Sequence, residues 1–272
     1  MATCIEKLPC KDCGSSDSVQ TYLNVDSVLG IDWITSFCHG ECWSNKGDPY
    51  NGIVPTVHVK SPEEIKEEIK DVQDCKIFAP RKNYRGIPKE FYRSWGIRTL
   101  FSTYDGKKPY AIGFPYSDYG DLCGWKCRPF HKKDFYGVGR TSDTDMFGWE
   151  RAQKLPGNVL WVTEGEFDAI ALDYAMTLVG SREQYPVVSL GHGGGSLTKN
   201  FNYIADRIKR YDYIVLVLDN DVVGLKAEEA AISMWPNLVH IVQKPFGCKD
   251  ANDAVKNSKA IEMGTLALNF WK

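Results

Sequence analysis

Four apolar runs mark the second half of the chain, and a helix-like segment separates each from the next. The runs cover residues 159–162, 186–190, 213–218 and 239–242. The helix-like segments lie near residues 166–177, 198–210 and 222–234. Buried runs that alternate with helices are typical of a parallel sheet covered on both faces. We therefore expect residues 156–272 to form an α/β domain with a mostly parallel sheet and flanking helices.

The first half of the chain has shorter apolar stretches and a different organisation. Residues 1–57 are rich in Cys, Gly and Ser, and their short apolar stretches predict a β-rich domain. A helix is expected to start at Ser61, because Ser61 and Glu64 form a capping box and Pro62 suits the first helical position. This acidic segment, 58–75, is predicted to be a solvated helix or linker. Residues 76–155 alternate strand-like runs with turns, which predicts a mixed α+β subdomain.

Charge is distributed unevenly along the chain. The net charge is −2 overall, but residues 76–140 hold 14 Lys/Arg against 5 Asp/Glu, a net +9. The flanking segments are acidic, with 6 against 13 in residues 1–75 and 13 against 17 in residues 141–272. The basic segment also holds 15 of the 34 aromatic residues. Clustered cations attract phosphates and aromatic rings stack on unpaired bases, so nucleic acid is the favoured partner. A solvated basic face over an aromatic core is the alternative.

The composition also indicates where the protein acts. The N-terminus has no basic start followed by an apolar run, so no secretory signal is expected. No segment approaches the roughly 18 apolar residues that cross a bilayer. We expect a cytoplasmic protein without membrane contact. In a reducing compartment, closely spaced cysteines are more often metal ligands than disulfides.

Two cysteine pairs in the N-terminal domain have metal-ligand spacing. Cys10 and Cys13 are separated by two residues, and Cys38 and Cys42 follow after 24 residues with a gap of three. Four thiolates from two hairpin tips give the closed tetrahedral site that structural zinc prefers. We therefore predict one zinc ion in a zinc ribbon. His39 as a substitute ligand and buried thiols without metal are the alternatives.

Acidic residues follow three of the predicted strands. Glu164 leaves the first strand, and Asp219 and Asp221 follow the most apolar one. Residues 249–253 bring further acids after the last strand. Ligands of open parallel sheets bind outside the carboxyl ends of the strands, and converging carboxylates there suit Mg²⁺ or Mn²⁺. Such a site supports phosphoryl transfer. Helix capping is an equal alternative for three other acids, which are Glu166, Asp168 and Asp253.

A glycine-rich turn follows the second predicted strand. It covers residues 190–196 and includes His192 and Gly193. Glycines let backbone N–H groups approach a phosphate, and the next helix presents its positive end there. We therefore predict that His192 and Gly193 contact nucleotide.

Together these motifs resemble the primase half of the bacteriophage primase–helicase family and, more distantly, bacterial DNA primases. The resemblance covers nearly the whole chain, and its most specific stretches are residues 162–168, 186–193, 219–221 and 249–252. The Glu and Asp-x-Asp elements look like the Toprim motif. The four cysteines look like the family's zinc-binding domain, which reads a short template trinucleotide.

The resemblance implies roles for two sets of residues. The implied magnesium-site acids are Glu164, Asp219 and Asp221, with Asp250 supporting a second ion. The implied phosphate contacts are Lys126, Arg128 and Lys133. The implied partners are a single-stranded DNA template, NTPs, a replicative helicase and a DNA polymerase. The chain has no G-x4-G-K-[ST] phosphate loop, so we expect no helicase domain within it.

These inferences predict a DNA primase, a DNA-directed RNA polymerase that joins NTPs into short primers by metal-dependent nucleotidyl transfer. A Toprim-type nuclease would use the same acids to hydrolyse DNA, and carboxylate spacing alone does not separate the two. A non-enzymatic zinc-ribbon protein that binds single-stranded DNA is the third hypothesis. Oligoribonucleotide products, shortened DNA or neither would distinguish them.

Overall fold

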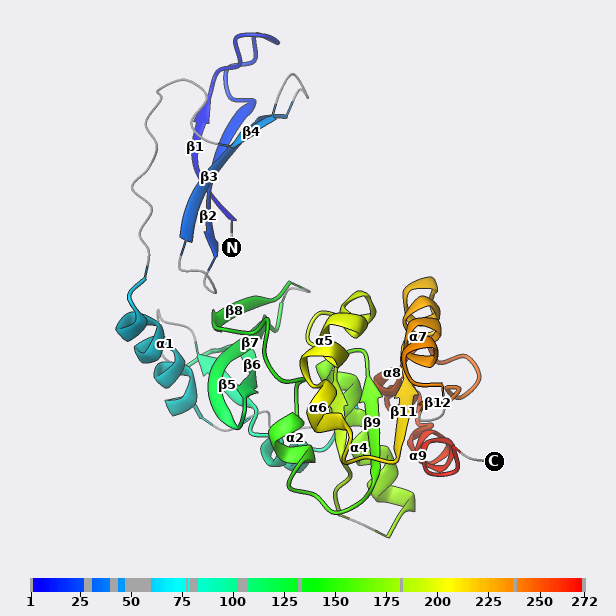
Figure 1. The fold of residues 1–272 in the computed structure, drawn as a ribbon. Helices are drawn as coiled ribbons and strands as arrows, with labels where there is room; N and C mark the ends of the chain where they lie inside the picture. Colours follow the sequence, from blue (N-terminus) through cyan, green and yellow to red (C-terminus); the bar gives the residue numbers. More distant parts are fainter. Residues whose placement is uncertain are drawn as a thin grey trace.

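Three four-stranded sheets organise the chain (Figure 1). The computed structural model describes residues 2–26, 31–39, 44–46, 60–76, 78, 83–101, 107–131, 134–181, 183–236 and 239–270. Within these ranges, none of the helices has the length and apolar content that crossing a membrane requires.

The N-terminal sheet is antiparallel and follows the order β1-β2-β3-β4. Its strands are β1 (Ala2–Leu8), β2 (Val19–Asp26), β3 (Ile31–Cys38) and β4 (Ser44–Lys46). β2 and β3 pair over eight positions, from Val19 opposite Cys38 to Asp26 opposite Ile31. The predicted β-rich N-terminal region is confirmed. The pairing also sets the start of β2 beside the end of β3, which brings Cys38 to the turn that follows β1.

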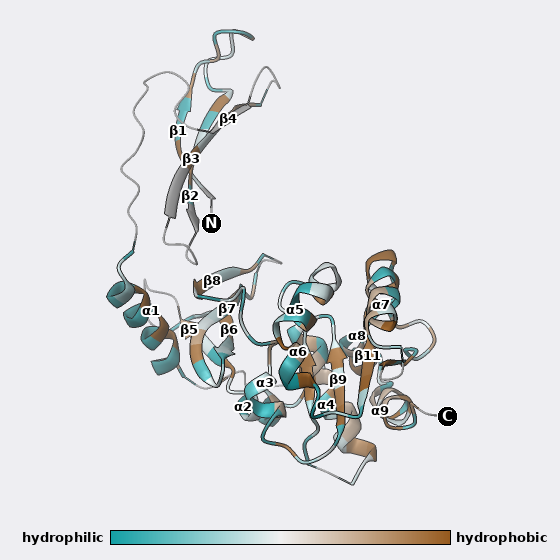
Figure 2. Cartoon of the chain, in the orientation of Figure 1, coloured by the Kyte–Doolittle hydropathy of each residue, from teal (hydrophilic) through white to brown (hydrophobic). Residues whose placement is uncertain are grey.

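Helix α1 (Pro62–Asp74) begins where the capping box predicts. The Ser61 hydroxyl accepts a hydrogen bond from the Glu64 N–H at 3.2 Å, and the Glu64 carboxylate accepts one from the Ser61 N–H at 2.7 Å. The helix is teal over most of its length with a narrow apolar stripe (Figure 2). That stripe packs on the middle sheet, since Val72 is buried and the Ile69 carbonyl accepts a 3.1 Å hydrogen bond from the Trp125 indole. The segment expected to be a solvated helix or linker therefore covers one face of a sheet.

The middle sheet is an antiparallel meander in the order β5-β6-β7-β8. Its strands are β5 (Arg98–Phe101), β6 (Pro109–Asp118), β7 (Asp121–Pro129) and β8 (Tyr136–Gly139), preceded by α2 (Lys89–Ser94). Alternation along β7 sends Trp125 and Cys127 to the α1 face, because successive side chains of a strand point to opposite faces. Lys126 and Arg128 therefore face the other way, toward the C-terminal domain.

The C-terminal sheet is parallel, in the order β10-β9-β11-β12, as the apolar runs predict. Its strands are β9 (Val159–Thr163), β10 (Val187–Ser189), β11 (Tyr213–Val217) and β12 (Val239–Ile241). The helices are α3 (Trp149–Ala152), α4 (Glu166–Val179), α5 (Leu197–Tyr203), α6 (Ala205–Ile208), α7 (Val222–Met234), α8 (Ala251–Lys256) and α9 (Ala260–Leu268). A short 3₁₀ turn, Gly194–Ser196, precedes α5.

Both faces of this sheet are buried. Trp161 and Val215 pack in a core with α4, α8 and α9, whereas Leu160 and Ile214 pack in a second core with α3, α5, α6 and α7. Figure 2 shows the resulting apolar strands β9 and β11 between the helices. The first core continues into the middle sheet, where the Phe114 and Phe167 rings lie 5.0 Å apart. Shared packing therefore fixes the basic face of β7 relative to the carboxyl ends of the parallel strands.

Candidate active site

Three aspartates converge at the carboxyl ends of the two central parallel strands. Asp168 lies in the first turn of α4 after β9, Asp219 follows β11, and Asp250 caps α8. One carboxylate oxygen from each lies within 4.8 Å of the others. Oxygens around one Mg²⁺ lie about 3 to 4 Å apart, because the ion binds six ligands at about 2.0–2.1 Å. Small side-chain rotations would let these three carboxylates hold one divalent cation, so the donor set fits the metal.

Crowding of the acids shifts their proton affinities. Burial, followed by the charges of Glu164 and Asp250, raises the pKa of Asp219 to about 6. Burial and the neighbouring Asp250 raise the pKa of Asp168 well above its usual range. Asp250 is also buried, but a 2.6 Å hydrogen bond from the Asp253 N–H and the nearby Lys249 ammonium hold its pKa below the usual value. The site therefore gathers negative charge that a cation would relieve.

Glu164 borders the cluster from the loop between β9 and α4. Its Oε2 is buried and makes no hydrogen bond among the described residues. A Cβ added at Gly193 would lie 3.3 Å from Glu164 Oε1, and one at Gly194 would lie 3.2 Å from Oε2. The glycine-rich turn therefore leaves just enough room for this carboxylate. Its unpaired buried oxygen is a further donor that a cation could use.

Asp221 has a different role from its neighbour Asp219. Its Oδ1 accepts hydrogen bonds from the N–H groups of Val223 and Gly224, both at 2.9 Å, and caps the N-terminus of α7. It does not belong to the trio of converging carboxylates found among the described residues. Of the two acids in the Asp-x-Asp element, Asp219 therefore belongs to the cluster and Asp221 caps α7.

Asp168 joins the predicted acids Asp219 and Asp250 in the trio, which contains neither Glu164 nor Asp221, and a polar chain supports Asp168. The Asn252 N–H donates to Asp168 Oδ1 at 3.0 Å. The Asn252 side chain accepts from Arg85 Nε at 2.6 Å and donates to the Arg85 carbonyl at 3.1 Å. Asn252 belongs to a motif singled out above, but no pattern in the sequence points to Arg85.

Lys126 faces the acids, but in this structure it is already paired. Its Nζ lies 2.7 Å from Glu166 Oε1 and donates to the Gly191 carbonyl at 2.9 Å. The Tyr116 hydroxyl donates to the same Glu166 oxygen at 2.6 Å. Burial, followed by the Glu166 charge, raises the pKa of Tyr116 well above its usual value. Through Glu166, Tyr116 and Lys126 fix β6 and β7 to the start of α4. The bond from Lys126 to the Gly191 carbonyl fixes β7 to the glycine-rich turn.

Two other predicted nucleotide contacts, Arg128 and His192, lie near the Lys126–Glu166 pair. The Arg128 guanidinium lies 5.4 Å from the centre of the Phe167 ring, and its buried Nε has no hydrogen-bond partner among the described residues. Burial and the nearby Arg85 lower the pKa of Arg128. Partial burial and the Lys126 charge lower the pKa of His192, which favours a neutral ring at pH 7. Lys133 lies outside the described residues.

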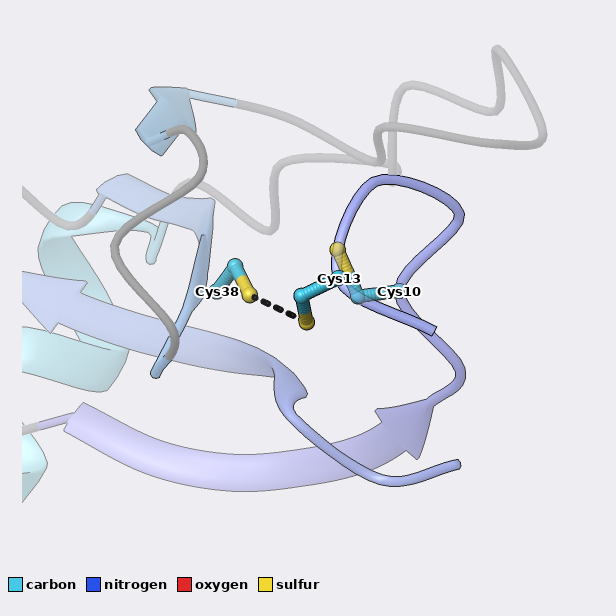
Figure 3. Close-up of side chains that lie close together, drawn as sticks. All are labelled: Cys10, Cys13 and Cys38. Atoms are coloured by element: carbon cyan, nitrogen blue, oxygen red, sulfur yellow. Dashed lines mark hydrogen bonds between the residues drawn. The ribbon is translucent and has the colours of Figure 1, made fainter. Parts of the chain in front are cut away.

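Three of the four predicted zinc ligands converge in the N-terminal sheet (Figure 3). The sulfur atoms of Cys10, Cys13 and Cys38 lie within 4.8 Å of one another, and those of Cys13 and Cys38 are 3.7 Å apart. Two sulfurs bound at about 2.3 Å to a tetrahedral zinc lie about 3.8 Å apart. The cysteine geometry therefore fits zinc.

The surroundings of the cluster favour metal binding. A hydrogen bond with Ser18, followed by one with the Ser15 backbone, lowers the pKa of the Cys13 thiol. The His39 ring packs at 4.9 Å edge-on against Phe37 and does not join the cluster that the described residues form. Cys42, the fourth predicted ligand, lies outside the described residues.

Comparisons with known proteins agree with this fold. The Toprim-like family model matches residues 161–255, which include all three converging aspartates. The DNA helicase/primase of Enterobacteria phage T3 is 26% identical over 269 residues. That alignment covers 97% of this chain but only 44% of the T3 protein, so the chain spans less than half of this relative's length.

Two solved structures match as well. The crystal structure of the primase fragment of the bacteriophage T7 primase–helicase is 26% identical, with a TM-score of 0.57, over 97% of this chain and 99% of the fragment. A chain from a structure of the T7 lagging-strand DNA polymerase interacting with primase domains bound to an RNA/DNA hybrid and dTTP is 30% identical. It has a TM-score of 0.56 and matches over 68% of this chain and 89% of its own length.

The fold and the acidic cluster define a Toprim-like protein, with a parallel sheet whose carboxyl edge presents the site. The chain belongs to the bacteriophage primase–helicase family and corresponds to its primase part.

Proposed function

We propose that the chain is a DNA primase that makes short RNA primers from NTPs on single-stranded DNA. The observation that carries this proposal is the trio of aspartates at the carboxyl ends of the strands, with the β7 cation Lys126 bound to Glu166 at the start of the helix that also carries Asp168. Acids alone suit either nucleotidyl transfer or hydrolysis. A basic face near the acids favours a reaction whose substrates carry triphosphates, because its positive charges balance the negative charge of the phosphates.

The proposed metal ligands are Asp168, Asp219 and Asp250, with Glu164 and Asp221 beside them. Divalent cations bound there would neutralise the triphosphate and stabilise the attacking and leaving oxygens. In the reaction, the 3′-oxygen of the first nucleotide forms a bond to the α-phosphorus of the second. The bond from that phosphorus to pyrophosphate breaks, and the hydroxyl proton passes to solvent.

The remaining residues of the chain would position the substrates. Arg85 and Arg128 flank the Phe167 ring at 4.1 and 5.4 Å and offer positive charge beside the acids. Lys126 can exchange its bond to the Gly191 carbonyl for one to a phosphate without leaving Glu166. Backbone N–H groups of the turn that contains Gly193 would contact phosphate oxygens.

The N-terminal sheet would hold a structural zinc ion and contact the template. The proposed ligands are Cys10, Cys13, Cys38 and Cys42. A DNA polymerase and a replicative helicase are the proposed partners, on the strength of the T7 and T3 relatives. The host cytoplasm is the proposed site of action, since relatives encoded by phages replicate DNA there.

One incubation tests the proposal. The protein is mixed with single-stranded DNA, labelled NTPs and Mg²⁺, and the products are separated by length. Wild type and an Asp206→Asn control, altered at an exposed acid of α6, should both yield oligoribonucleotides. Asp219→Asn and Asp168→Asn should yield none while remaining folded. Shortened DNA without RNA product would establish the nuclease instead.

A further inference from the structure

Phe135 is an exposed aromatic residue beside the cations that face the acidic site. Phe135 is 43% exposed, whereas Phe114, Tyr116 and Trp125 of the middle sheet are buried. Lys126 Nζ lies 4.5 Å from the centre of the ring, and the Arg128 guanidinium lies 5.6 Å from it. These cation–π contacts orient the ring beside the cations. Because Phe135 is partly exposed, part of the ring remains available to a ligand.

The contacts of these cations connect Phe135 to the acids. Arg128 also lies 5.4 Å from the Phe167 ring, and the Arg85 guanidinium lies 4.1 Å from the same ring. Arg85 binds Asn252, whose N–H donates to Asp168. A continuous row of rings and cations therefore runs from Phe135 to the aspartate cluster.

We propose that Phe135 is a stacking platform for a nucleobase whose phosphate is held by Lys126 and Arg128. This inference rests on the proposed function, because it assigns one binding contact of that reaction. A nucleotide joins a flat base to a phosphate, and this surface presents a ring next to two cations. Stacking tolerates every base, since each has a π-face, so Phe135 positions the nucleotide without selecting its sequence.

Two other exposed aromatic residues in the part of the chain that the structure describes, Tyr119 and Tyr213, have different surroundings. The Tyr119 ring lies 4.3 Å from the Arg207 guanidinium at the β6–β7 turn, and Arg207 is itself paired with Asp145. Tyr213 is 38% exposed, but it is the first residue of β11 and so lies at the opposite end of the strand from Asp219. Tyr213 therefore offers a control of similar exposure away from the site.

Fluorescence of 2-aminopurine tests the inference, because stacking on an aromatic ring quenches it. One arm uses an oligodeoxynucleotide that contains 2-aminopurine, and the other uses 2-aminopurine riboside triphosphate, both without added Mg²⁺ to prevent turnover. Phe135→Leu removes the ring but keeps an apolar side chain, and Phe135→Tyr keeps a ring. Tyr213→Leu is the matched control, and circular dichroism verifies folding of each variant.

Wild type, Phe135→Tyr and Tyr213→Leu should quench the probe in at least one arm, and that arm identifies template or incoming nucleotide as the source of the base. Phe135→Leu should lose the quenching and bind that probe about 5-fold or more weakly, because the stacking contact with the base is lost. In primer synthesis it should raise the KM for the same substrate with little change in kcat.

Equal quenching by wild type and Phe135→Leu in both arms, or no quenching by wild type, would overturn the inference. Absence of primer synthesis by wild type, with quenching intact, would instead defeat the proposed function and leave the stacking site standing.

Discussion

Replacing Asp219 by Asn should make the metal-free protein more stable while it abolishes activity. Asp219 lies with Asp168 and Asp250 in a cluster whose carboxylate oxygens fall within 4.8 Å of one another. Its side chain is only 19% exposed, so solvent screens the repulsion poorly. Asn has nearly the same shape without the charge, so the substitution isolates the electrostatic cost.

The size of the effect follows from the pKa of Asp219, which burial and its neighbours raise to about 6. This value lies about two pH units above that of the unfolded chain, and each unit corresponds to about 1.4 kcal/mol. Below about pH 4 the carboxyl is protonated in both states, so it costs no stability. The cost grows between about pH 4 and 6 and reaches about 3 kcal/mol above pH 6.

Urea unfolding in EDTA, followed by tryptophan fluorescence from pH 4 to 8, measures this cost. Asp219→Asn should be about 3 kcal/mol more stable than wild type at pH 7.5 and nearly equal to it at pH 4. Asp206→Asn should gain nothing at pH 7.5, because a hydrogen bond from Lys209 lowers the pKa of Asp206. A variant that is less stable than wild type at every pH would refute the repulsion on which the argument depends.

Three further predictions concern other parts of the chain. Cys13→Ser should lose bound zinc, measured by metal release, whereas Cys4→Ser at an exposed thiol should retain it. Glu166→Ala leaves Lys126, which is only 15% exposed, without its partner and should cost about 3–5 kcal/mol in urea unfolding. Glu150→Ala, which breaks the exposed pair with Lys154, should cost under about 1 kcal/mol. Gly194→Ala places a Cβ 3.2 Å from Glu164 Oε2 and should slow dinucleotide synthesis about 10- to 100-fold. Gly195→Ala, where nothing lies within 4 Å of an added Cβ, should retain wild-type rates.

Local patterns in the sequence predict the elements that carry the site. The buried run at 213–218 predicts β11, because a strand covered on both faces is apolar throughout. The capping box at Ser61 likewise predicts the start of α1. Whether α1 is free or packed depends on the middle sheet, which buries Val72 through contacts that no short segment encodes.

The membership of the acidic cluster is harder to predict. Asp168 in the first turn of α4 and Asp221 at the start of α7 both look like acids that stabilise a helix N-terminus. Only the three-dimensional structure distinguishes them, since it brings Asp168 to Asp250 and leaves Asp221 bonded to its own helix. The hydrogen bond between Arg85 and Asn252 joins residues 167 positions apart, and no local sequence pattern near either residue predicts it.

The central claim is that Asp168, Asp219 and Asp250 bind a divalent cation. A crystal grown with Mn²⁺ and measured at a wavelength where manganese scatters anomalously tests it most directly. We expect an anomalous peak among the three carboxylates, at about 2.2 Å from an oxygen of each, as for other divalent cations bound by carboxylates. Manganese bound elsewhere on the chain, with no peak at these aspartates, would contradict the claim.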